Sequence, residues 1–377
     1  DEICKKNNIL PFQMEGIRFG ISRSDRYLLA DDMGLGKTLQ ALMVAYFYRN
    51  QWPLLVICPA SLIGTWQEAV EKYFDQVILP HEIKAFFDSK DFSLDAKVCI
   101  TSYDLVVRNA QCILQKVPRI VIADECHFLK NKTTKRTKTI IPILHSALHL
   151  IMLSGTPALS RPIELYTQLN AINNKLFSNN SEFGFRYCAG VRDRFGVNFK
   201  GSSNEKELGI ILESTIMLRR TKQQVLQWLP AKIRKQIFLH VTSAPSTQVT
   251  TDVAALLDES LADNNSISFK RWKSSTDQKM PAILRYLGEL LLEESEDELR
   301  PKLLLFAHFK DTLDQLEEWL IKHKLLHIRI DGDTGTRERQ SLCDQFQCTT
   351  KIRVALLSIT AASVGLTLTS AKMVIFA

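Results

Sequence analysis

The amino-acid sequence predicts an α/β protein with doubly wound parallel sheets. Short, wholly apolar runs at residues 54–58 and 120–123 alternate with stretches that carry apolar residues at helical spacing. A glycine-containing turn at residues 31–36 connects an earlier apolar run directly to a helical stretch. A second series of apolar runs begins at residue 303. We therefore expect two sheets, each covered by helices.

The length and composition of the chain indicate a folded protein of two or three domains. Its 377 residues, 45% of them hydrophobic and 24% charged, supply ample core material and show no disorder signature. The eight cysteines never form a C-x-x-C pair, which favours reduced thiols over a disulfide framework or a zinc site. No apolar run approaches the ~20 residues of a membrane span, so we expect no membrane partner. The net charge of +7 is compatible with a polyanionic partner.

The first motif lies in residues 10–13, Leu-Pro-Phe-Gln, which open a helical stretch shortly before the glycine turn. Pro11 suits the first turn of a helix. The side-chain amide of Gln13 carries both a donor and an acceptor, as recognition of an adenine edge requires. A solvated glutamine on the helix surface is an equally good interpretation.

Residues 31–38, Asp-Asp-Met-Gly-Leu-Gly-Lys-Thr, follow an apolar run at residues 27–30 and read as a phosphate-binding loop. Glycines let backbone N–H groups approach phosphate oxygens, and a helix N-terminus attracts negative charge. Lys37 would reach the β- and γ-phosphates, and the Thr38 hydroxyl would bind Mg²⁺. The general pattern has glycine where this chain has Asp31, so the turn is a variant form. The alternative is a glycine-rich turn with a surface lysine. The residues expected to hold the nucleotide are Gly34, Leu35, Gly36, Lys37 and Thr38.

Two adjacent carboxylates, Asp124 and Glu125, follow the apolar run at residues 120–123. Carboxylates at the tip of a buried strand are costly unless they have a task. Beside a phosphate loop, Asp124 would hold Mg²⁺ and Glu125 would orient or deprotonate the attacking water. The alternative is that the two residues simply begin a helix.

Further candidate residues follow other predicted strands of the first series. After the run at residues 54–58, Ser61 or Thr65 is expected to cap a helix that carries Trp66. The run at residues 150–153 ends in Ser154-Gly155-Thr156-Pro157, which suits a hinge or a plain turn. Residues 130–138 contain five basic side chains, including Lys130 and Lys132. This basic stretch would grip a phosphate backbone or form an ordinary solvated surface.

The second series of apolar runs, at residues 303–306, 328–330, 354–357 and 373–376, predicts a second α/β unit. Asp311 is expected to cap its first helix. The chain begins without methionine and ends inside the last of these runs. We therefore expect it to be a piece of a longer protein.

Taken together, the motifs resemble those of superfamily-two motors in order and spacing. Residues 32–38, Asp-Met-Gly-Leu-Gly-Lys-Thr, resemble the Swi/Snf-type DNA translocases, and residues 183–234 resemble the HepA-related annealing-helicase branch. The resemblance covers essentially the whole chain. It implies two RecA-like lobes with a helical insertion, and a second lobe that is truncated at residue 377.

The resemblance also implies roles for individual residues. Gln13 would read adenine, Ser154 and Thr156 would couple hydrolysis to motion, and Gly365 would face the nucleotide from the second lobe. Lys37, Asp124 and Glu125 would form the catalytic group, with Thr38 and Asp124 serving Mg²⁺. A core role for Trp66 and Tyr103 is at least as good an interpretation as DNA binding. The candidate DNA contacts are Ser61, Trp66, Ser102, Tyr103, Lys130, Lys132, His308 and Lys310.

The expected domain organisation has four parts: an ATP-binding lobe at residues 1–165, a helical protrusion at 166–240, a linker at 241–300 and a partial second lobe at 301–377. The arginines with which relatives reach the γ-phosphate would lie beyond Ala377. Because the loss of such an arginine costs on the order of a thousand-fold in rate, we expect this chain alone to bind ATP better than it hydrolyses it.

The expected function is that of a nuclear, Mg²⁺-dependent DNA-dependent ATPase that translocates on duplex or forked DNA in DNA repair and replication-fork remodelling. One alternative is a chromatin remodeller that slides nucleosomes. Another is a nucleotide-regulated DNA-binding scaffold without turnover. The resemblance further implies contacts to a single-strand-binding protein or a sliding clamp through regions outside this chain.

Overall fold

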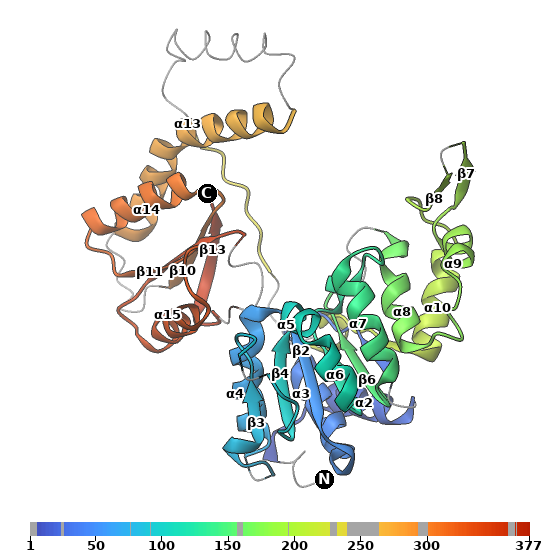
Figure 1. Ribbon diagram of the computed structural model, residues 1–377. Coiled ribbons are helices and arrows are strands. Elements are labelled where there is room, and N and C mark those ends of the chain that lie inside the picture. Colours follow the sequence, from blue (N-terminus) through green and yellow to red (C-terminus); the bar gives the residue numbers. More distant parts are fainter. Residues whose placement is uncertain are drawn as a thin grey trace. The chain divides into compact units, whose positions relative to one another are not determined.

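The computed structural model describes residues 6–23, 26–75, 77–90, 92–156, 161–194, 196–226, 232–239, 264–292, 301–360, 366 and 368–377. Contacts divide the chain into two compact units, Asp1–Ala231 and Lys232–Ala377. Each unit has its own parallel sheet, labelled in Figure 1. The finer division into four parts stays a prediction.

The first unit is organised around a seven-stranded sheet in the order β3-β4-β2-β5-β6-β1-β9. Every neighbouring pair in this sheet is parallel. The central strands are completely buried, which explains why they are apolar apart from His149 at the start of β6. The strands are β1 (Arg26–Leu29), β2 (Leu54–Cys58), β3 (Ile83–Ala85), β4 (Val98–Ser102), β5 (Ile120–Ala123), β6 (His149–Leu153) and β9 (Met217–Leu218).

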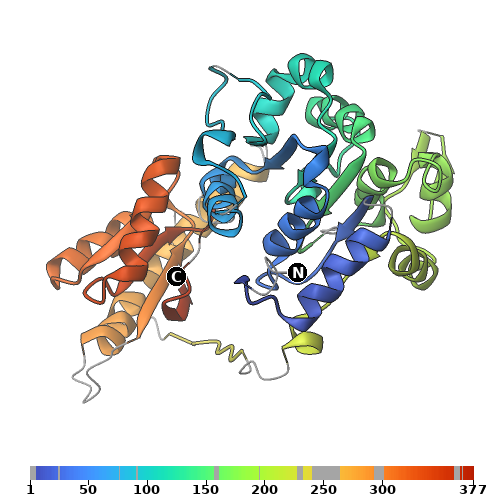
Figure 2. The same ribbon diagram turned by 90° about the horizontal axis from the view of Figure 1, so that it is seen from below.

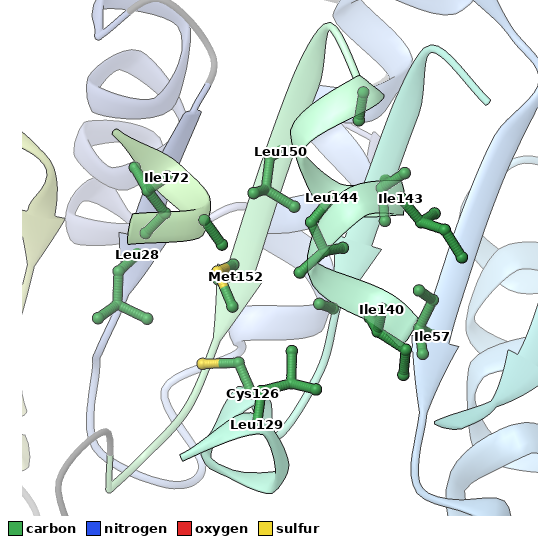
Figure 3. Packing of buried hydrophobic residues seen from close by; sticks show 14 of the residues in the cluster. Leu28, Ile57, Cys126, Leu129, Ile140, Ile143, Leu144, Leu150, Met152 and Ile172 are labelled. Atoms are coloured by element: carbon green, nitrogen blue, oxygen red, sulfur yellow. The ribbon is translucent and has the colours of Figure 1, made fainter. Parts of the chain in front are cut away.

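Helices cover both faces of this sheet (Figures 1 and 2). Side chains of β5 alternate between two cores: Ile120 and Ile122 pack on one face, and Val121 and Ala123 on the other. Figure 3 shows the second of these cores, where β6 packs against α7. The first face carries α2 (Pro11–Ser22), α3 (Lys37–Phe47) and α4 (Ile63–Tyr73), and the second α5 (Tyr103–Arg108), α6 (Ala110–Lys116), α7 (Lys135–Ser146) and α8 (Tyr166–Ile172).

The segment after β6 forms an insertion that leaves the sheet and then rejoins it. It contains α8, α9 (Asn180–Tyr187), the antiparallel hairpin β7 (Val191–Asp193) and β8 (Gly196–Asn198), and α10 (Glu205–Thr215). It returns as β9, which pairs in parallel with β1 and is followed by α11 (Lys222–Val225). The sequence pattern predicted mostly helix here, and it missed β9 because a two-residue strand shows no periodicity.

The second unit contains a four-stranded parallel sheet in the order β11-β12-β10-β13. Helices α13 and α14 pack on one face and α15 on the other. The expected doubly wound arrangement is therefore confirmed in both units. Its elements are α13 (Asn264–Leu292), β10 (Lys302–Ala307), α14 (Lys310–Lys322), β11 (His327–Ile330), α15 (Thr336–Cys348), β12 (Val354–Ser358) and β13 (Ala371–Phe376).

Short 3₁₀ helices complete the described structure, and two of the expected helix caps prove wrong. Helix α4 begins at Ile63, so neither Ser61 nor Thr65 is its N-cap. Helix α14 begins at Lys310, which places Asp311 in its first turn.

Within the described residues, no helix has the length and apolar character needed to cross a bilayer. The 3₁₀ helices are η1 (Arg49–Gln51), η2 (Ala60–Leu62), η3 (Pro80–Glu82), η4 (Cys126–Leu129) and η5 (Pro162–Leu165).

Candidate active site

The glycine turn between β1 and α3 has the backbone of a phosphate-binding loop. Gly34 and Gly36 adopt φ values of 85° and 75°, in the left-handed region that favours glycine. A Cβ atom on Gly36 would overlap Nε2 of Gln13, so a larger residue there would displace the Gln13 amide. Helix α3 begins at Lys37, directly after Gly36. The loop therefore presents the N-terminus of an 11-residue helix to its concave side.

Asp31, which stands where the general pattern has glycine, is fully buried and paired with Arg220. Its Oδ1 accepts from the backbone N–H and the Nε of Arg220, each at 3.1 Å. Its Oδ2 accepts from Nη2 of Arg220 at 2.5 Å and from Nε2 of Gln40 at 3.2 Å. A buried carboxylate is tolerated only with such compensation. The variant loop thus depends on an arginine that follows β9.

Arg220 also connects the loop to the two helices beside it. Its guanidinium donates to the carbonyl oxygen of Phe12 on α2 and, at 2.9 Å, to Oε1 of Gln40 on α3. Its Cζ lies 5.3 Å from the centre of the Phe12 ring. One side chain therefore holds the phosphate loop, α2 and α3 together.

Lys37 lies folded back against the loop. Its Nζ donates to the carbonyl oxygens of Asp31, at 2.9 Å, and Asp32, at 3.3 Å. Burial lowers the pKa of Lys37, while the charges of Glu125 and Asp124, followed by those of Asp31 and Asp32, oppose this shift. Lys37 and the two carboxylates after β5 consequently belong to one electrostatic site.

Gln13 lies beside the loop, as the sequence suggested. Its Oε1 accepts from the backbone N–H of Leu10 at 3.0 Å, and its Nε2 donates to the carbonyl oxygen of Leu35 at 3.2 Å. The side chain is 8% exposed, so it is a buried contact with the loop and not a solvated surface residue. Recognition of adenine by Gln13 stays a prediction.

Asp124 is held by hydrogen bonds from three directions. Its Oδ2 accepts from Nε1 of Trp66 at 2.9 Å, and its Oδ1 accepts from the N–H of Glu125 at 2.9 Å. Its backbone carbonyl oxygen accepts from the hydroxyl of Tyr103 at 2.7 Å. Trp66 and Tyr103 are 1% and 2% exposed, which agrees with the core interpretation of both aromatic residues. They orient Asp124 from inside the fold.

Burial raises the pKa of Asp124 to about 6, and the neighbouring Glu125 charge adds to the shift. The bond from Trp66 and the charge of Lys37 act in the opposite direction. The carboxylate form is therefore costly in this position. A cation bound beside Asp124 would remove that cost, so the side chain fits a site for Mg²⁺.

Glu125 is turned toward the end of β6. Its φ of 47° lies in the left-handed region, and its Oε2 is 3.2 Å from Nδ1 of His127. The same Nδ1 lies 3.3 Å from Oγ of Ser154, which accepts from the N–H of Thr156 at 3.2 Å. A chain of polar contacts thus joins Glu125 to both residues that were expected to couple hydrolysis to motion. Their coupling role stays a prediction.

We expect replacement of Trp66 with phenylalanine to lower the free energy of unfolding by about 1.5 to 3 kcal/mol, because the bond to a buried carboxylate is lost. Trp52→Phe is the matched control, since Nε1 of Trp52 donates to the neutral carbonyl of Ala45 at 3.0 Å. That change should cost only about 1 kcal/mol. Denaturant unfolding of both variants measures the difference, and equal losses would contradict an orienting bond to Asp124.

The remaining candidate DNA contacts of the first unit lie on several elements. Ser61 is half-buried in η2, and the Ser102 hydroxyl caps α5 by accepting from the N–H of Leu105 at 3.3 Å. Lys130 and Lys132 are exposed, and Nζ of Lys130 lies 3.7 Å from Glu164. A DNA-binding role for these residues stays a prediction.

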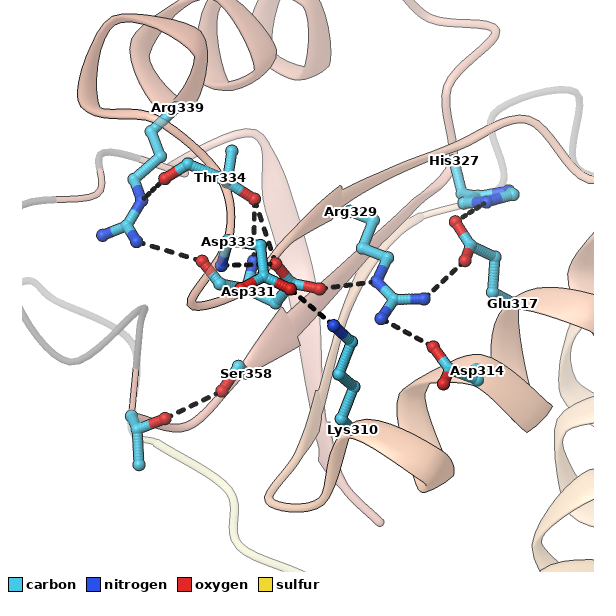
Figure 4. Close-up of polar contacts among 11 residues, drawn as sticks. Lys310, Asp314, Glu317, His327, Arg329, Asp331, Asp333, Thr334, Arg339 and Ser358 are labelled. Carbon is cyan, nitrogen blue, oxygen red and sulfur yellow. Dashed lines mark hydrogen bonds and ion pairs between the residues drawn. The ribbon is translucent and has the colours of Figure 1, made fainter.

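In the second unit, candidate residues gather at the carboxyl ends of β10 and β11 (Figure 4). Lys310 pairs with Asp333 at 2.5 Å. His308, two residues before Lys310 in the chain, is exposed. Arg329 donates to Asp331 at 2.9 Å. Although burial alone would raise the pKa of Asp331, the Asp333 N–H and Arg329 keep it below its ordinary value. Gly365 lies outside the described residues.

Sequence reasoning missed the contribution of the segment after β9. Residues 217–222 were noted only for their resemblance to one branch of translocases, yet they supply the partners of both aspartates in the phosphate loop. The signal was Asp31 itself, because a buried acidic residue in place of glycine demands a cation. Nothing in the spacing identified Arg220 as that cation.

A glycine loop at a helix N-terminus, facing paired carboxylates at the end of a parallel strand, is typical of the P-loop class of nucleotide-binding proteins. Residues 12–288 match the SNF2-related domain family, and residues 282–377 match the helicase conserved C-terminal domain. The chain belongs to the SNF2-related family.

Several known proteins are similar to this chain. The SWI/SNF-related matrix-associated actin-dependent regulator of chromatin subfamily A-like protein 1 of Xenopus tropicalis is 41% identical over 98% of the chain, which spans 39% of that protein. The human DNA annealing helicase and endonuclease ZRANB3 is 35% identical over 98% of the chain, which spans 35% of it. The chain thus spans well under half the length of these two relatives.

The solved SWI2/SNF2 ATPase core domain of Sulfolobus solfataricus aligns with 97% of this chain and 79% of its own, at a TM-score of 0.50 and 23% identity. This likeness concerns the fold alone. It confirms the expected pair of RecA-like lobes.

Proposed function

We propose that the protein is an ATP-dependent DNA translocase that acts on duplex and forked DNA as an annealing helicase. The observation that carries this proposal is that Lys37 shares one electrostatic site with Asp124 and Glu125, beside a loop with phosphate-binding geometry. The names of the relatives support the DNA substrate, since the human relative is called a DNA annealing helicase. Their names also support action in the nucleus, where chromatin is found.

In this proposal the loop residues 34–38 bind the phosphates of ATP, and Gln13 recognises its adenine. Thr38 and Asp124 hold Mg²⁺, which when bound neutralises phosphate charge. Glu125 accepts a proton from the water that attacks the γ-phosphorus, and the products are ADP and inorganic phosphate. Lys37 exchanges its bonds to the carbonyls of Asp31 and Asp32 for bonds to phosphate oxygens.

One alternative has a specific basis. Because the Xenopus relative is named a regulator of chromatin, nucleosomes are the competing substrate. ATP turnover by the complete gene product should be compared without DNA, with linear duplex, with forked DNA and with nucleosomes. The Lys37→Ala variant measures the background from contaminating ATPases.

The substrate that stimulates turnover most decides between these functions. Greatest stimulation by forked DNA is the expected result, and greatest stimulation by nucleosomes would favour remodelling. An ATP turnover rate that is the same without DNA and with each DNA substrate would overturn the translocase proposal. DNA binding that changes with nucleotide while no turnover occurs would instead support a regulated scaffold.

A further inference from the structure

The segment that follows β9 is fixed directly against the phosphate loop. The N–H of Asp32 donates to the carbonyl oxygen of Arg220 at 3.0 Å, and the N–H of Lys222 donates to Oδ2 of Asp32 at 2.9 Å. Thr221 is the N-cap of α11 and forms a capping box with Gln224, whose Oε1 accepts from the Thr221 N–H at 2.7 Å. These bonds fix the backbone from which the Lys222 side chain extends.

The Lys222 side chain runs along the glycine turn. A Cβ atom placed on Gly34 would lie 3.4 Å from Nζ of Lys222 and 3.5 Å from its Cε. The ammonium group therefore lies beside Gly34 of the phosphate-binding loop. Lys222 is exposed, and among the described residues no side chain forms an ion pair or hydrogen bond with its Nζ.

The other cations around the loop are engaged in different ways. Arg220 is committed to Asp31 and to two helices, and Lys37 donates to the carbonyl oxygens of Asp31 and Asp32. Lys222 reaches the loop from the start of α11, which follows the strand that ends the insertion. Of these three, it is the cation that can contact a phosphate without giving up a buried partner.

We propose that Lys222 is a second phosphate-binding cation, which contacts the bound nucleotide across Gly34. This inference rests on the proposed function, because it assumes that the loop binds a nucleoside phosphate. It also gives the insertion a direct link to the nucleotide, since Lys222 lies four residues after the last residue of β9. Binding of nucleotide at the loop would then stabilise the pairing of β9 with β1.

The test is isothermal titration of the complete gene product with Mg²⁺-ADP and with the Mg²⁺ complex of a non-hydrolysable β,γ-imido analogue of ATP. We expect Lys222→Ala to weaken binding about tenfold, as for loss of one hydrogen bond between charged groups, and Lys222→Arg to retain most of the affinity. Lys206→Ala is the matched control, because it removes the same charge from an exposed position on α10. A larger loss for the triphosphate than for ADP would place the contact at the terminal phosphate.

A second measurement separates a phosphate contact from an indirect structural effect. Lys222→Ala should reduce the dependence of the dissociation constant on salt concentration, and nucleotide should protect β9 from hydrogen exchange less than in the wild type. Equal affinity of Lys222→Ala and wild type for both nucleotides would overturn the inference and leave the proposed function standing. If the wild type binds neither nucleotide, the proposed function itself fails.

Discussion

Replacement of Arg220 with methionine is expected to destabilise the first unit by about 3 to 5 kcal/mol. The physical reason is that Asp31 is fully buried, and its charge would lose the partner that compensates its desolvation. Methionine keeps much of the side-chain volume, so the lost charge dominates the effect. Thermal unfolding of the complete gene product, with hydrogen exchange to locate the change in residues 26–36, measures it.

The control for this prediction is the neighbouring residue. Arg219 is exposed, and Arg219→Met should change stability by less than about 0.5 kcal/mol. The double variant Asp31→Leu with Arg220→Met removes both charges and should recover much of the loss. If Arg220→Met proves as mild as Arg219→Met, Asp31 does not depend on this ion pair.

Replacement of Glu125 with glutamine is expected to reduce DNA-stimulated ATP turnover by about 100- to 10,000-fold, while nucleotide binding persists. Glutamine has nearly the same shape but cannot accept a proton from water. Glutamine can adopt the same left-handed backbone conformation as Glu125, because the strain of that conformation arises in the main chain and not in the side chain. Single-turnover hydrolysis, together with titration of the non-hydrolysable ATP analogue, separates the chemical step from binding.

Glu71→Gln is the control for this chemical prediction, since Glu71 lies on α4 and accepts from Gln67 at 2.9 Å on the surface. It should turn over ATP at the wild-type rate. A Glu125→Gln variant that retains turnover within tenfold of the wild type would show that another group handles the water.

The strands were predictable because their residues are buried on both faces. A strand such as β5, buried on both faces in the middle of a parallel sheet, is expected to be largely apolar, and that pattern is visible in the sequence. The place of Asp124 and Glu125 at the end of β5 followed from the same argument. The local sequence pattern was thus sufficient to predict a feature wherever that feature depends on a single strand and the residues directly after it.

The sequence was insufficient wherever two distant segments determine the site together. Arg220 contacts Asp31 across 189 positions of the chain, and no local pattern records such a pair. The expected caps at Ser61 and Thr65 failed for a related reason, because η2 precedes α4 and moves its start to Ile63. The burial of Trp66 against Asp124 likewise needed the packed structure.

The strands β6 and β9, which flank β1, limit where the length of the chain can vary between members of this family. The insertion leaves from β6 and returns in β9, and β1 pairs with both. Its two ends are therefore anchored at a fixed separation, whatever lies between them. Because doubling the length of a flexible loop costs only about 0.6 kcal/mol in closure entropy, the exposed hairpin of β7 and β8 can grow or shrink at little expense, whereas α9 packs into the core through Phe183 and Tyr187. We therefore expect changes in the length of this hairpin to leave the two anchoring strands in place.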